Sequence, residues 1–195
     1  MKAEDNLKQV LLAFSYVRRA LDIATKPENK LKYQFVVYNA SIKTWHIIRP
    51  LSRPQWAKNL VEVVEKISNL LEEVDDSDFN WRCRYLNVLV KAMVDADRKP
   101  DALKILDKLW DLTKKKGECR FQETLFRTRI HLYRDNNAIL ANIKKDTETG
   151  PDPNAYKALY VIQSIKSGII PDVQVEKELT AVMASLSPSA VSSDP

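Results

Sequence analysis

The sequence contains little of what builds sheets, nucleotide loops or disulfide frameworks. Of its 195 residues only three are glycine (Gly117, Gly150 and Gly168) and two are cysteine (Cys83 and Cys119). Sheet proteins and phosphate-binding loops use glycines in turns and at close backbone approaches, so their scarcity favours helices joined by polar turns. Two cysteines cannot form a disulfide framework, and neither begins a C-x-x-C motif. A reducing intracellular compartment is therefore expected.

Long apolar runs and catalytic motifs are also missing. No apolar run approaches the roughly 20 residues that span a bilayer, and residues 1–5 lack the apolar core of a signal peptide. We therefore expect no membrane partner and a cytoplasmic location. The sequence has no Walker loop, paired dinucleotide glycines, nucleophile elbow or H-E-x-x-H motif, and His46 and His131 offer no local zinc spacing. These absences predict a protein that is not an enzyme, with no cofactor and no metal.

Charge is present in both signs, with a modest basic excess. The formal net charge is +5, and charged residues make up 29% of the chain. This excess suits an acidic partner, but it falls short of the dense basic face of a dedicated nucleic-acid-binding domain. We therefore expect other proteins, and not nucleic acid, as partners.

Helical periodicity recurs along almost the whole chain. In residues 6–24 the apolar residues follow a 3-4 spacing that makes one face of a helix. Similar patterns predict helices over residues 31–48, 55–74, 81–97, 100–116, 118–135, 137–145, 152–166 and 173–186. The sequence thus predicts an all-α fold, a helical-hairpin solenoid of about eight to nine helices over residues 1–186. A Ser/Pro/Ala tail over residues 187–195 has the composition of a disordered segment.

An internal repeat with an offset of 36 residues supports the stacked architecture. The aligned pairs are Cys83 with Cys119, Arg84 with Arg120, Tyr85 with Phe121, Leu89 with Leu125, Val90 with Phe126, Arg98 with Arg134, and Ala102 with Ala138. The offset is close to the roughly 34-residue tetratricopeptide period. In that motif large apolar residues of the first helix pack against a small residue near the start of the second, the position of Ala102. The motif's glycine is replaced by Val90 and Phe126, so the match is partial.

Basic residues at seven-residue spacing are the candidate binding site. Residues at this spacing share a helix face, and the first helix of each pair lines the inner groove of a tetratricopeptide stack. A basic ladder there predicts charge-assisted binding of an acidic, carboxylate-rich tail. The alternative is a solvated face whose charges only keep the protein soluble. The candidate partner-binding residues are Arg84, Lys91, Arg98, Arg120, Arg127, His131 and Arg134.

Cysteine and tryptophan have simpler interpretations. Cys83 and Cys119 occupy equivalent repeat positions, which favours a shared packing role over a metal or redox pair. Trp110 closes an apolar helix face and is expected in the core. Trp56, just after Pro54, is the best candidate for an exposed tryptophan.

A run near the start of the chain resembles a known family. Residues 32–41, Lys-Tyr-Gln-Phe-Val-Val-Tyr-Asn-Ala-Ser, are followed by Trp45 and by Ile48-Arg49-Pro50-Leu51. This run is similar to the N-terminal region of the large tetratricopeptide-repeat cilia- and flagella-associated protein of the ciliary central-pair apparatus. The resemblance covers about residues 3–167 and rests on residue choices, not on a catalytic signature.

The resemblance implies a structural role in the cilium axoneme. The chain would be part of a central-apparatus projection that contributes to cilium movement, as a fragment or short isoform of a longer protein. Its partners would be other central-apparatus components or acidic tubulin tails. The alternative is an RNA-binding helical-repeat protein, because such proteins also present basic inner faces. That function needs base-reading residues in many repeats, and only two clear repeats are visible.

Overall fold

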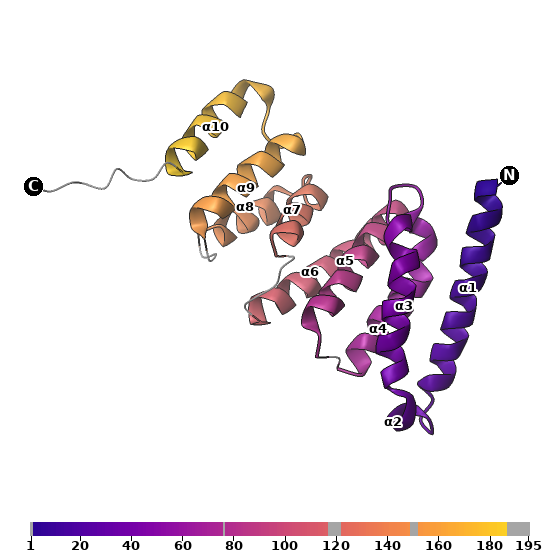
Figure 1. The fold of residues 1–195 in the computed structure, drawn as a ribbon. Coiled ribbons are helices and arrows are strands. Elements are labelled where there is room, and N and C mark those ends of the chain that lie inside the picture. Colours follow the sequence, from indigo (N-terminus) through magenta and orange to yellow (C-terminus); the bar gives the residue numbers. More distant parts are fainter. Residues whose placement is uncertain (1, 76, 117–121, 149–151, 187–195) are drawn as a thin grey trace, which may run out of the picture. The chain divides into compact units, whose positions relative to one another are not determined.

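A computed structural model describes residues 2–75, 77–116, 122–148 and 152–186, and it is helical throughout these ranges apart from the turns (Figure 1). The predicted all-α class and helical stacking are confirmed. The chain divides into two compact units, Met1–Phe121 and Gln122–Pro195. In chain order the described elements are α1 (Lys2–Ala24), α2 (Lys30–Tyr33), α3 (Phe35–Leu51), the 3-10 helix η1 (Ala57–Leu60), α4 (Val61–Glu73), α5 (Phe79–Asp95), α6 (Lys99–Lys116), α7 (Gln122–Leu132), α8 (Asn137–Asp146), α9 (Pro153–Lys166) and α10 (Asp172–Leu186).

The helix predicted over residues 31–48 is divided and longer than expected. Gln34 separates the single turn α2 from α3, and α3 continues through Pro50 to Leu51. Proline lacks the N–H that would continue the hydrogen-bond ladder. Because Pro50 lies in the last turn of α3, the loss is confined to the helix end and the helix stops one residue later.

The helix predicted over residues 55–74 starts later, because its first residues have another conformation. Gln55 has a φ of 71°, in the left-handed region, so it cannot be part of a right-handed helix. The chain then forms η1 before α4 begins at Val61. No glycine marks this turn, which is why the sequence pattern did not indicate it.

The core of the first unit is centred on α5, which packs against α4, η1 and α6. Tyr85, Leu89 and Met93 follow one another at four-residue steps on α5, and each is at most 1% exposed. The neighbouring elements contribute fully buried aliphatic side chains to the same core, namely Leu60, Ile67, Leu71, Leu106 and Leu109. Burial of large aliphatic and aromatic side chains on both sides of α5 makes it the central helix of the unit.

Helix α1 is attached to the unit by apolar contacts and by ion pairs. It packs against α3 and α4 through Phe14 and Leu21, which are 3% and 0% exposed. On the same side Arg18 pairs with Glu62, and Asp22 lies 2.7 Å from Lys66. Both partners advance by four residues in the same direction, so α1 and α4 run parallel, as alternate helices of an up-and-down stack do.

The second unit is built from α7 to α10. Helix α7 packs against α8 and α9, and α9 packs against α10. Phe126 of α7 meets Tyr156 of α9 edge to face, with ring centroids 5.0 Å apart. Arg129 and Asp146, both largely buried, form an ion pair of 3.1 Å that joins α7 to α8.

Three of the described helices begin directly after a polar residue that caps them. Asp78, Asn136 and Asp152 cap α5, α8 and α9, each accepting a hydrogen bond from the backbone N–H three residues later. Such caps satisfy N–H groups that have no partner within the helix. The start of α9 at Pro153, directly after Asp152, confirms the sequence prediction for that helix.

The two copies of the repeat bury equivalent residues on their first helix, but they differ in burial on their second helix. Leu89 and Leu125 are both buried, as are Val90 and Phe126. Ala102 is fully buried, whereas its repeat equivalent Ala138 is exposed. The small residue thus permits close helix packing in one copy only. The tetratricopeptide assignment and the single domain over residues 1–186 stay predictions, and the tail over 187–195 lies outside the described residues.

Candidate protein-binding surface

The seven predicted basic residues belong to two sets, one in each unit. Arg84 and Lys91 lie on α5, and Arg98 follows its end. Arg127 and His131 lie on α7, and Arg134 follows its end, while Arg120 lies outside the described residues. Because both helices end before the third position, Arg98 and Arg134 lie in turns and do not continue the helical face. The seven-residue spacing predicted one continuous helical face for each set, but in the structure this face stops at the helix end, before the third residue of the set.

Arg84 is held between two tryptophans. Its guanidinium carbon lies 5.4 Å from the ring centroids of both Trp45, on α3, and Trp81, on α5. A guanidinium over an indole face is attracted by the negative face of the ring. Arg84 is half-buried in this arrangement. Its charge is thus used within the unit, as a link between α3 and α5.

Three other ladder arginines have acidic neighbours. Arg98 lies 2.9 Å from Asp101, Arg127 lies 2.6 Å from Glu123, and Arg134 lies 3.6 Å from Asp135. These pairs are exposed or half-exposed, so each contributes little to stability and can exchange for another carboxylate. The ladder arginines therefore present less positive charge than their number suggests.

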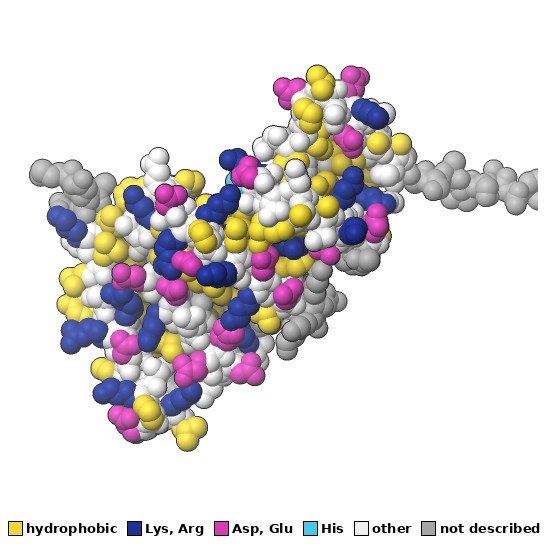
Figure 2. Space-filling view, turned by 180° about the vertical axis from the view of Figure 1, so that it is seen from behind, with side chains coloured by type: hydrophobic (Ala, Val, Ile, Leu, Met, Phe, Trp, Pro, Cys, Tyr) yellow, Lys and Arg dark blue, Asp and Glu magenta, His cyan; other side chains and the backbone are white. Residues whose placement is uncertain are grey.

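Lys91 and His131 differ from the arginines. Lys91 is exposed on α5 and makes no ion pair with any residue that the structure describes. The Nδ1 atom of His131 lies 3.3 Å from the hydroxyl oxygen of Ser167, just beyond the end of α9. On the face that Figure 2 presents, basic and acidic side chains are intermixed. Among the members of the predicted set that the structure describes, Lys91 is the residue most open to an acidic partner.

An aromatic cluster between α3 and α5 was not predicted. Trp45 lies 5.4 Å from Trp81 and 5.6 Å from Tyr85 between ring centroids, and Trp81 lies 5.6 Å from Tyr85. Tyr38 adjoins the cluster, 6.5 Å from Trp81. The sequence does contain a signal for this cluster. Tyr38 and Trp45 are seven residues apart, and Trp81 and Tyr85 are four residues apart, so each pair lies on one helix face.

Hydrogen bonds to α3 fix this cluster. The indole N–H of Trp81 donates to the Ser41 hydroxyl at 2.7 Å, and the Tyr85 hydroxyl donates to the Ser41 carbonyl. The Thr44 hydroxyl lies 3.0 Å from that of Tyr85. Burial raises the pKa of Tyr85 above its ordinary value, because the phenolate would be poorly solvated. The buried polar groups are therefore matched across the two helices, as a structural contact requires.

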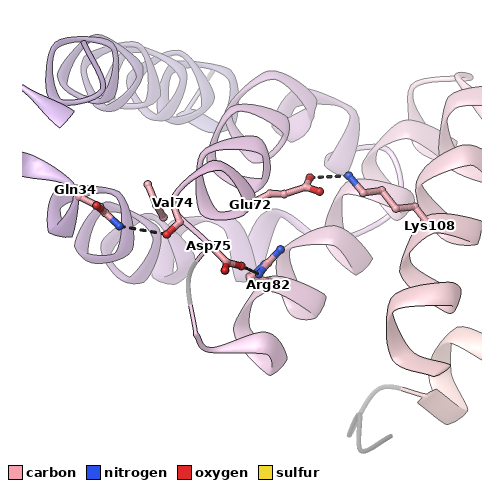
Figure 3. A network of polar contacts seen from close by, with 6 residues as sticks. All are labelled: Gln34, Glu72, Val74, Asp75, Arg82 and Lys108. Atoms are coloured by element: carbon pink, nitrogen blue, oxygen red, sulfur yellow. Dashed lines mark hydrogen bonds and ion pairs between the residues drawn. The ribbon is translucent and has the colours of Figure 1, made fainter. Parts of the chain in front are cut away.

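The C-terminal end of α4 is connected to α5, to α6 and to Gln34, which lies between α2 and α3 (Figure 3). The Gln34 amide donates to the Val74 carbonyl at 3.2 Å, Arg82 of α5 lies 3.2 Å from Asp75, and Lys108 of α6 lies 2.6 Å from Glu72. Lys30 also bonds Glu73 at 2.6 Å, and this hydrogen bond lowers the pKa of the Glu73 carboxyl. The acidic segment after α4 therefore anchors the helix end to its neighbours.

A hollow lies between α8, α9 and α10 in the second unit. Its volume is about 360 Å³, and its lining includes Tyr160, Ser164, Ile169 and Val182. Burial raises the pKa of Tyr160 above its ordinary value. The rim carries charges of both signs, from Lys144, Lys157, Glu148 and Glu178, so it does not select one sign of ligand charge.

The remaining candidates have structural positions. Cys83 is buried, which agrees with a packing role, and Cys119 lies outside the described residues. Trp110 is 4% exposed and Trp56 is 39% exposed, so both tryptophan predictions are confirmed.

No group of three or more His, Cys, Asp or Glu side chains in the described ranges is arranged to hold a metal ion. None of the described helices combines the length and apolar character that a bilayer-spanning helix needs.

The fold defines an all-helical protein of the helical-repeat type, in which helices that are close in the chain pack against one another within each unit. The sequence is similar to Cilia- and flagella-associated protein 46 of Chlamydomonas reinhardtii, with 27% identity over 96 residues. The match covers 49% of this chain and 3% of that protein, so the chain corresponds to a small part of its relative. No protein-family model matches the sequence. The similarity agrees with the resemblance to a cilia-associated protein carried by residues 32–51.

Proposed function

We propose that this chain is a non-catalytic scaffold that binds other proteins, as a structural component of the ciliary central-apparatus projection that contributes to cilium motility. The observation that carries the proposal is the similarity to a cilia- and flagella-associated protein over half of the chain. The helical stack supports it, because such stacks offer extended surfaces for partners. The polar groups of the α3–α5 contact also bond one another, as in a structural contact.

An acidic protein segment is the partner that the charges favour, such as the acidic tails of tubulin or a carboxylate-rich segment of another central-apparatus component. Lys91 is exposed, and Arg98 has only an exposed pair with Asp101 to give up. Arg84 contributes through its position between Trp45 and Trp81 rather than as a free charge. The binding surface of the first unit therefore centres on Lys91 and Arg98.

A binding measurement with a glutamate-rich peptide tests this surface. Fluorescence anisotropy at low salt should show an affinity about two- to fivefold lower for Lys91→Gln with Arg98→Gln, the range that exposed ion pairs give. The matched control is Lys145→Gln with Lys177→Gln, two exposed lysines on α8 and α10 that lie outside this surface. Equal losses in both double variants would show that only net charge matters, and the proposed surface would then be wrong.

A location measurement tests the ciliary part of the proposal. The chain, fused to a fluorescent protein and expressed in motile ciliated cells, should be retained in detergent-extracted axonemes. The Tyr85→Ala variant, which opens the α3–α5 contact, should be lost from them if the folded stack is what binds. Absence of the unaltered chain from axonemes that incorporate other projection components would contradict the proposal.

A further inference from the structure

Helix α1 has apolar residues on two opposite sides. Phe14 and Leu21 are buried against α3 and α4, on the inner side. Leu12, Tyr16 and Ile23 are 53%, 59% and 59% exposed. At 100° per residue these three lie about 180° from Phe14 and Leu21. Figure 2 shows hydrophobic side chains reaching the surface along the side of the first unit that α1 forms.

The outer side of α1 has the spacing of a helix-packing seam. Leu12, Tyr16, Arg19 and Ile23 follow one another at steps of four, three and four residues. Steps of this kind keep residues on one stripe, and in coiled coils they mark the line along which two helices meet. We call these four residues the outer stripe. An exposed and largely apolar stripe of this kind is typical of an interaction surface.

The outer stripe is complementary to itself. Its steps read the same in both directions, so a second α1 running antiparallel places Leu12 opposite Ile23 and Tyr16 opposite Arg19. Each contact then occurs twice about a twofold axis, as in an isologous dimer. An arginine over a tyrosine ring is attracted, and this chain already stacks Arg84 on Trp45 and Trp81.

A parallel arrangement lacks this complementarity. It would place Arg19 beside Arg19 of the second copy, and two like charges along an apolar seam repel each other.

We propose that α1 binds a second copy of this chain through its outer stripe, as an antiparallel helix pair with twofold symmetry. The inference concerns the first unit alone and does not depend on the proposed ciliary function.

Sedimentation velocity over about 10 µM to about 1 mM of the full chain tests the pairing, because an interface this small associates weakly. The unaltered chain should pass from the monomer mass to twice that mass as concentration rises. Tyr16→Lys places a lysine opposite Arg19 of the second copy and should shift dimerisation at least tenfold higher in concentration. Tyr16→Lys with Arg19→Glu places opposite charges across the axis and should restore it.

Control variants separate this contact from general hydrophobic association. Val173→Lys removes an apolar side chain that is 90% exposed on α10, and it should leave dimerisation unchanged. Circular dichroism should show equal helix content in all variants, because the altered side chains are at the surface. A chain that is monomeric throughout the concentration range overturns the proposal. So does a dimer that Tyr16→Lys leaves intact, or one that the added Arg19→Glu change does not restore.

Discussion

The hydroxyl of Tyr85, on α5, donates a hydrogen bond to the backbone carbonyl of Ser41, on α3. Tyr85 is fully buried, so this bond lies inside the contact between two helices that are 44 residues apart at this point. The neighbouring Thr44 hydroxyl keeps its own bond to the Ala40 carbonyl at 2.8 Å. Loss of the tyrosine hydroxyl therefore removes its bond to the Ser41 carbonyl and its contact with Thr44, while Thr44 keeps the Ala40 carbonyl as a partner.

Tyr85→Phe should lower the free energy of unfolding by about 1–2 kcal/mol, because each intramolecular hydrogen bond usually contributes about 1 kcal/mol. Tyr85→Ala should lower it by about 3–5 kcal/mol, because a large buried ring is also lost. Urea denaturation followed by tryptophan fluorescence measures both, since all four tryptophans lie in the first unit. Equal costs for the two variants would show that the ring itself does not support the core.

Alkaline pH should destabilise the first unit through the same residue. Burial raises the pKa of Tyr85, so above about pH 10 the unfolded chain loses this proton while the folded chain retains it. Stability contributed by the protonated form is therefore present below about pH 10 and declines as the pH rises further. Urea midpoints measured across this range should fall less steeply for Tyr85→Phe. Parallel pH profiles for the two proteins would be inconsistent with a buried, protonated Tyr85.

The two repeat copies allow a matched packing test. Ala102→Trp should destabilise the protein by about 1–3 kcal/mol, because this fully buried position has no room for an indole. Ala138→Trp, at the equivalent but exposed position, should change stability by less than about 0.5 kcal/mol. Urea unfolding followed by circular dichroism distinguishes the two. A well-tolerated tryptophan at position 102 would refute close packing of α5 and α6 there.

Asp95, the last residue of α5, should stabilise the turn that leads into η1, which lies about 40 residues earlier in the chain. Its carboxylate accepts hydrogen bonds from the backbone N–H groups of Gln55, at 2.6 Å, and Lys58, at 2.9 Å. Asp95→Ala leaves these donors without their acceptor and should cost about 1–2 kcal/mol, as loss of a helix cap does. Asp111→Ala, at an exposed position of α6, is the control and should be nearly neutral. A neutral Asp95→Ala variant would mean that water replaces the carboxylate at no cost.

Local patterns predicted the helices well. The 3-4 spacing that contains Phe14 and Leu21 indicated α1, and Asp152 before Pro153 indicated the start of α9. Both signals act within a few residues, so the sequence alone contains them. The late start of α4 was missed because it follows from the left-handed conformation of Gln55, a residue type that rarely adopts it.

The candidate site was harder to predict because its contacts are not local. Arg84 was expected to offer its charge to a partner, as part of a row of basic residues on one helix face. Instead its guanidinium packs over the ring of Trp45, which lies on another helix. Helical periodicity identifies which residues share a face, but it does not identify the residues that meet that face. The same limit applies to Ala138, which aligns with the buried Ala102 and is nevertheless exposed.

The most direct test of the scaffold proposal is affinity capture from ciliated-cell extract with the full chain as bait, with and without RNase, read by mass spectrometry. The proposed function predicts enrichment of central-apparatus proteins or tubulin that survives RNase. The Lys91→Gln and Arg98→Gln double variant should capture less of them than the Lys145→Gln and Lys177→Gln control. Enrichment of RNA-binding proteins that disappears with RNase would contradict the scaffold and favour the RNA-binding alternative.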